Sequence, residues 1–274
     1  MIVSEAKKVI EQRFECLQAS FRQKFGHELK GSPEESCFYY PEHLPAILAW
    51  NSVAQSDDDL IDLAGYNQHT IGDLGDADVI FLGNNPGSAG VFSDDPAKQA
   101  KEMAKIRESV KYLPLPGGFY PLANANLMRF MPWFPNRLRR PDSLLGPFLR
   151  VNPDICRFAP CFASAELSPY HTRYFTNSGL QLLSQKKNDA VNEKVRAAMR
   201  RGAILIAMYV GAKDRWIERI PELENCDNFY FCHNPPRTNP RFSTELERLS
   251  VPGRSAYGEV IARFEKRFRA RGLI

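Results

Sequence analysis

A short apolar run that ends abruptly in a turn constrains the fold of this chain more than any other feature. Residues 79–82 (Val-Ile-Phe-Leu) are wholly apolar, which is typical of a strand buried on both faces. Residues 83–87 (Gly-Asn-Asn-Pro-Gly) cannot continue that strand, because glycine favours turn conformations and Pro86 fixes its own φ. We therefore expect a rigid turn at the carboxyl end of a core strand, the edge where open α/β sheets bind ligands.

The rest of the sequence alternates between helical and strand-like segments. Helical patterns cover residues 4–25, 43–53, 93–111, 186–201 and 254–271, and another helix runs through Trp216. Strand-like runs occur in residues 157–167, 203–208 and 229–232. This alternation predicts a parallel sheet with helices on both sides. We expect a single α/β domain over residues 1–274, with an N-terminal helical layer (1–74), a core (75–245) and a C-terminal helix (246–274).

Composition restricts the classes of protein that this chain can represent. Its formal net charge of +4 over 274 residues is compatible with a polyanionic partner without requiring one. Its six cysteines include no Cys-x-x-Cys pair, so we expect neither a disulfide framework nor a metal site, and no cofactor. We find no membrane-spanning run and no signal-peptide pattern, so we expect a soluble, cytoplasmic protein.

A second polar turn follows another buried strand. Residues 229–232 (Phe-Tyr-Phe-Cys) lead directly into His233, and prolines follow at positions 235 and 236. Alone, an Asn-Pro-Gly turn after a strand is usually structural, and so is a lone histidine before prolines. Together the two turns favour a site: if their strands are neighbours, Asn85 and His233 face the same crevice.

At these positions the sequence resembles the uracil-DNA glycosylase superfamily. Residues 83–87 are similar to the Gly-x-Asn-Pro-Gly motif of its mismatch-specific and single-strand-selective branches. Residues 233–237 (His-Asn-Pro-Pro-Arg) are similar to its His-Pro-Ser-Pro-Arg motif, and residues 208–212 look like its third strand with the terminal glycine. The resemblance covers about residues 75–245. It implies a three-layer α/β/α fold with a central, mostly parallel four-stranded sheet.

The resemblance also implies an activity, namely hydrolysis of the N-glycosidic bond of a damaged or mismatched base in DNA, as in base excision repair. Asn85 would position the attacking water, and His233 would donate a hydrogen bond to the departing base. An amide is a poor base, so the sugar must become largely cation-like before water attacks. The partners implied are single- or double-stranded DNA and the free nucleobase as product, with no metal and no membrane.

The remaining site residues follow from the same resemblance. The base would be flipped out of the DNA and held against Phe119 or Tyr120. Arg237 would enter the gap that the base leaves in the duplex. The base-binding set is Gly83, Asn84, Pro86, Gly87, Phe119, Tyr120, Glu166 and Tyr170. The DNA-contact set is Ser88, Pro235, Pro236, Arg237 and Thr238.

Glu166 departs from the family pattern. It stands where family members carry an amide that reads the uracil edge, and an ionised carboxylate accepts hydrogen bonds without donating them. Two alternatives therefore stay open: a non-catalytic member that binds nucleic acid or nucleotides, and a hydrolase of small nucleosides. The base, the strand preference and the oligomeric state are left open. Two basic segments are open to two interpretations: residues 128–140 as a nucleic-acid contact strip or a solvated edge, and the C-terminal helix as a DNA clamp or a solvated face. We favour the solvated edge and the solvated face.

Overall fold

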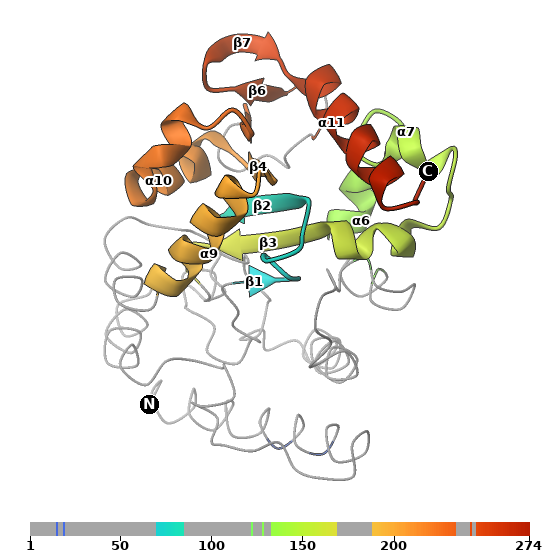
Figure 1. Ribbon diagram of the computed structural model, residues 1–274, viewed down its shortest axis with the longest axis horizontal. Helices are drawn as coiled ribbons and strands as arrows, with labels where there is room; N and C mark the ends of the chain where they lie inside the picture. The colour runs from blue at the N-terminus through green and yellow to red at the C-terminus, as the bar shows by residue number, and fades with distance from the viewer. Residues whose placement is uncertain are drawn as a thin grey trace, which may run out of the picture. The chain divides into compact units, whose positions relative to one another are not determined.

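The computed structural model describes residues 70–84, 133–168, 188–233 and 245–274, with isolated positions at Glu15, Ala19, Leu122, Met128 and Phe242 (Figure 1). The chain divides into two compact units. The first unit comprises Met1–His69, Asn85–Leu115 and Glu166–Asn188, and the second comprises Thr70–Asn84, Pro116–Ala165 and Asp189–Ile274. Nearly all of the described residues belong to the second unit. A single domain over residues 1–274 stays a prediction.

The described strands form one seven-stranded sheet in the order β1-β3-β2-β4-β5-β6-β7. Their bounds are β1 Thr70–Ile71, β2 Val79–Gly83, β3 Phe162–Glu166, β4 Ile204–Ala207, β5 Phe229–Cys232, β6 Leu246–Arg248 and β7 Val251–Ser255. The pairs β2–β4 and β4–β5 are parallel, whereas β1–β3, β5–β6 and β6–β7 are antiparallel. The α/β class is confirmed, but the sheet is mixed and larger than the expected four strands.

The four expected strands are β2, β3, β4 and β5, and they lie next to one another in the centre of the sheet. Every residue of these strands is buried, as the short apolar runs predict. The added strands β1, β6 and β7 lie outside this group. The segment 246–274, expected to be a helix alone, contains β6 and β7 before its helix begins.

The described helices are α6 Trp133–Leu138, α7 Gly146–Leu149, α9 Asn188–Arg200, α10 Val210–Arg219 and α11 Tyr257–Ala270, with short 3-10 helices at Ile155–Cys161 and Pro221–Asn225. Helices α9, α10 and α11 agree with predicted helices within a few residues, whereas α6, α7 and the 3-10 helices were not predicted, and the strand predicted from residue 157 begins at Phe162. The helices predicted at residues 4–25, 43–53 and 93–111 lie outside the residues that the structure describes. Among the described helices, none has the length and apolarity needed to cross a bilayer.

Helices cover both faces of the sheet (Figure 1). On one face, Phe162 of β3 packs against Phe264 of α11, with ring centroids 6.0 Å apart. On the other face, the Lys213 ammonium of α10 lies 4.9 Å from the ring centroid of Phe231 in β5. Since alternate strand residues point to opposite faces, both sides of the central strands are used for packing. The second unit is therefore a sheet between two helical layers.

Of the segment predicted as a solvated edge, the structure describes Met128 and residues 133–140, and these are solvated only in part: Arg139 and Arg140 are exposed, but Leu138 is buried. The Phe134 ring lies 5.2 Å from that of Phe81, a core residue of β2. The Arg137 guanidinium lies 4.3 Å from the ring centroid of Trp133 and donates a hydrogen bond to its backbone carbonyl at 2.9 Å. Burial lowers the pKa of Arg137, with a smaller contribution from Arg140. Leu138 thus belongs to the core and Trp133 and Phe134 pack against it, which the charges of the segment do not predict.

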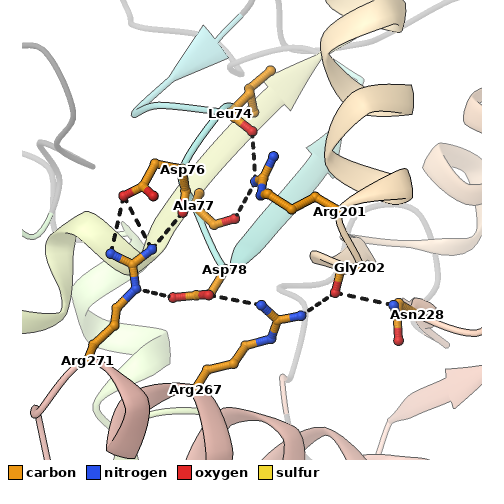
Figure 2. A network of polar contacts seen from close by, with 9 residues as sticks. All are labelled: Leu74, Asp76, Ala77, Asp78, Arg201, Gly202, Asn228, Arg267 and Arg271. Carbon is orange, nitrogen blue, oxygen red and sulfur yellow. Dashed lines mark hydrogen bonds and ion pairs between the residues drawn. The ribbon is translucent and has the colours of Figure 1, made fainter.

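At the amino-terminal edge of the sheet, an ion-pair network joins β2 to α11 (Figure 2). The Asp78 side chain is only 11% exposed, and its carboxylate lies 3.0 Å from Arg267 and 2.6 Å from Arg271. Arg271 also binds Asp76, and Arg201 donates to the carbonyls of the loop before β2. The expected solvated face on the C-terminal helix is therefore wrong for Arg267 and Arg271, because the helix lies against a buried carboxylate.

At the same edge, further hydrogen bonds join α11 to the residues that precede β4 and β5. Arg267 donates to the carbonyl of Gly202, just before β4, and the Asn228 amide donates to the same carbonyl at 3.2 Å. Arg263 in turn donates to Asn228, just before β5. These groups satisfy one another, so this edge is structural. The polar groups that are available to contact a ligand lie at the opposite edge.

Candidate functional site

The carboxyl edge of the sheet brings three strand ends together. Because β2, β4 and β5 are parallel, Asn84, Met208 and His233 leave the sheet at the same side. In the strand order, β3 lies next to β2 on the side away from β4, and β5 lies next to β4 on the side away from β2. The strand order therefore reverses between β2 and β4, and open α/β sheets bind ligands at such switch points.

The strands that precede Asn85 and His233 are not neighbours. The sequence allowed for direct pairing, but β4 lies between β2 and β5. Two strand spacings separate β2 from β5, which is about 10 Å. A group bound at this edge would therefore span the end of β4.

A buried tryptophan binds the last residue of β2. Trp216 of α10 is fully buried, and its Nε1–H donates to the Gly83 carbonyl at 2.9 Å. One residue earlier, the Leu82 carbonyl still accepts from the backbone of Met208, at 3.0 Å. The indole thus satisfies the carbonyl of the last residue of β2. Sequence reasoning placed Trp216 on a helix but gave it no role.

Asn84 is the most unusual polar residue at this edge. It is 4% exposed, and its Oδ1 atom is buried without a hydrogen-bond partner in the described structure. Leaving a buried acceptor unsatisfied costs about 1–3 kcal/mol, so such groups are uncommon and call for an explanation. An amide oxygen in this position can accept a hydrogen bond from an N–H or O–H group that enters the carboxyl edge.

His233 is accessible, in contrast to Asn84. Its side chain is 66% exposed, while its backbone N–H donates to the Glu245 carbonyl at 2.8 Å. Its Nδ1 atom lies 3.6 Å from Oε1 of Glu247, whose side chain is 14% exposed. The main chain of His233 is therefore fixed while its ring stays open to solvent, as a residue that contacts a ligand requires. Sequence reasoning missed Glu247, because it assigned residues 246–274 to a helix.

Glu166 ends β3 and is 6% exposed. Burial raises the pKa of its carboxyl to about 8. At neutral pH the group is therefore mostly protonated, and a protonated carboxyl donates one hydrogen bond and accepts others. The expectation that Glu166 could only accept is corrected, because the sequence pattern did not predict how completely this residue is buried.

Of the predicted site residues, the structure describes Gly83, Asn84, Glu166 and His233. It brings Gly83, Asn84 and His233 to one edge of the sheet. The others lie outside the described residues: Asn85, Pro86, Gly87, Ser88, Phe119, Tyr120, Tyr170, Pro235, Pro236, Arg237 and Thr238. Within the described ranges, no group of three or more His, Cys, Asp or Glu side chains is arranged to hold a metal ion.

Comparison of the chain with protein-family models, with curated proteins and with solved structures finds no match in any of the three. The function is therefore inferred from the site itself.

Proposed function

We propose that this protein is a uracil-DNA glycosylase-like hydrolase that releases a damaged or mismatched base from DNA. The observation that carries the proposal is the arrangement at the carboxyl edge. The unpartnered, buried Oδ1 of Asn84 and the exposed ring of His233 follow parallel strands on either side of β4. His233 is also a residue of the motif that resembles the family, and Asn84 directly precedes the motif asparagine, Asn85.

In the proposed reaction, the bond between the sugar C1′ and the base nitrogen breaks, and its electrons leave with the base. His233 donates a hydrogen bond to the base oxygen as negative charge grows there. A positioned donor of this kind is worth about 2.7–4 kcal/mol of the barrier. Asn85 orients a water that adds to the cation-like sugar, and the proton released from that water ends on solvent or on the base.

The protonation of Glu166 supports a base of the uracil type. A neutral carboxylic acid offers one donor and one acceptor, as the amide in the resembling family does. The sequence difference at this position therefore does not argue against contact with a base carbonyl. With the raised pKa of about 8, the donor is present at neutral pH.

The test is strand cleavage by alkali after incubation with labelled oligonucleotides that contain uracil, hypoxanthine, xanthine or a T·G mismatch. We expect abasic-site formation on at least one substrate, and its loss in both His233→Ala and Asn85→Ala. Asn225→Ala is the matched control, because Asn225 is an exposed amide in the 3-10 helix that precedes β5. This variant should retain full activity.

The alternatives give different results in the same experiment. Binding to oligonucleotides that weakens with salt, without abasic sites on any substrate, would indicate a non-catalytic nucleic-acid-binding protein, because phosphate contacts release counterions. Release of base from free nucleosides but not from oligonucleotides would indicate a nucleoside hydrolase. Full activity in both His233→Ala and Asn85→Ala would exclude the assigned site.

A further inference from the structure

We infer that Glu247 is a positioning residue that sets the orientation and the tautomer of the His233 imidazole. The expected effect of Glu247 on base release rests on the proposed function, whereas its effect on the His233 ring rests only on the contact between the two side chains. Oε1 of Glu247 lies 3.6 Å from Nδ1 of His233. The two residues come from different strands, since His233 follows β5 and Glu247 lies in the antiparallel neighbour β6.

The Glu247 carboxylate is held in place from its other side. Oε2 accepts a hydrogen bond from the backbone N–H of Gly253 at 2.9 Å. Gly253 has a φ of +74°, a conformation that favours glycine, and the β6–β7 register is irregular at Glu247 and Arg248. The hairpin that sequence reasoning missed thus directs one carboxylate oxygen to its own turn and leaves the other toward His233.

The His233 main chain is held by the same segment. Its N–H donates to the carbonyl of Glu245, two residues before Glu247. The backbone and the ring of His233 are therefore both approached by groups from one short stretch. Phe231, the cross-strand partner of Glu247, has its ring centroid 6.4 Å from that of His233, and the ammonium of Lys213 lies over Phe231 and 2.9 Å from Asp214.

A carboxylate that faces Nδ1 favours the form of the ring in which Nδ1 carries the proton. Nε2 then faces away from Glu247. In the neutral ring, Nε2 is an acceptor, and only in the protonated ring does it become a donor. Under this arrangement, His233 can donate from Nε2 to a departing base only as an imidazolium. Without Glu247, the neutral ring is free to place its proton on Nε2 and donate from there.

The test uses long-range ¹H–¹⁵N NMR spectra of the histidine side chains in the full chain, together with the pH profile of base release. The His233 signals are identified by their disappearance in His233→Ala. We expect neutral His233 to be Nδ1–H in the wild type and in Glu247→Gln, whose amide oxygen presents an acceptor to the same side of the ring. Glu247→Ala should shift the ring to Nε2–H and extend base release to higher pH.

Glu224→Ala is the matched control, since Glu224 is an exposed carboxylate far along the chain from this hairpin, and it should change neither the tautomer nor the profile. An unchanged His233 tautomer in Glu247→Ala would overturn the inference, whether or not activity falls. If no substrate releases a base, the NMR result still decides the role of Glu247. A shifted tautomer without any glycosylase activity would leave this inference standing and remove the proposed function.

Discussion

The indole Nε1–H of Trp216 donates to the carbonyl of Gly83, which lies 133 residues earlier in the chain. This single bond joins α10 to the residue at which β2 stops and the candidate site begins. The bond is buried, so neither partner can replace it with a contact to bulk water. The last residue of β2 is therefore held by a helix that follows a different strand.

Replacing Trp216 with phenylalanine should destabilise the protein by about 3 kcal/mol, because the Gly83 carbonyl is left buried without a donor and the smaller ring leaves space. The loss is measured as the free energy of unfolding in urea. Trp133→Phe is the control: its ring is half-buried, and its indole nitrogen donates to no group in the described part of the chain. We expect a loss of about 1 kcal/mol there, from weaker contact with Arg137. Equal losses in both variants would contradict a specific role for the Gly83 contact.

The Asp78→Asn variant should lose about 3 kcal/mol, since it leaves the guanidinium groups of Arg267 and Arg271 without their shared, buried carboxylate. Asp76→Asn removes a carboxylate that contacts Arg271 but is 68% exposed, and it should cost less than about 1 kcal/mol. Chemical unfolding of both variants at one pH makes the comparison. A larger loss in Asp76→Asn would show that burial does not govern this network.

Glu166→Gln should change the pH dependence of stability. The folded pKa of about 8 is higher than the ordinary value of 4.5, so between these values the folded chain keeps a proton that the unfolded chain has released. Stability should therefore fall as pH rises through this window and level off above about pH 8.

The glutamine variant lacks this proton, so its stability relative to wild type should increase by on the order of 3 kcal/mol between pH 4.5 and pH 7. Urea unfolding of both proteins at a series of pH values measures the difference. Glu224→Gln, at an exposed position, should give a difference that does not vary with pH. A difference between Glu166→Gln and wild type that is equally independent of pH would show that Glu166 is ionised in the folded protein.

Asn84→Ala should have little effect on stability despite complete burial. The variant loses packing but also removes the unsatisfied Oδ1 atom, and we expect these opposing effects to cancel to within about 1 kcal/mol. If the oxygen accepts from a bound base, substrate affinity should fall in the same variant. Thermal unfolding and oligonucleotide titration measure the two effects. A stability loss of several kcal/mol with unchanged affinity would mean that Asn84 is a structural residue.

The amino-acid sequence alone was sufficient to predict β2, β4, β5 and α9, α10 and α11. The strands are continuous apolar runs and the helices show regular apolar spacing, so the pattern of each segment is visible within the segment itself. It also located Gly83, Asn84 and His233 as polar or glycine residues at strand ends.

Only the tertiary structure decided the rest. Strand β7 contains Pro252 and Gly253 and has no strand-like pattern, and it forms because β6 offers it a partner. The placement of β4 between the two motif strands, the protonation of Glu166, and the approach of Glu247 to His233 each depend on groups from distant parts of the chain. Burial and electrostatic contact are properties of neighbours in space, and a local sequence pattern does not contain them.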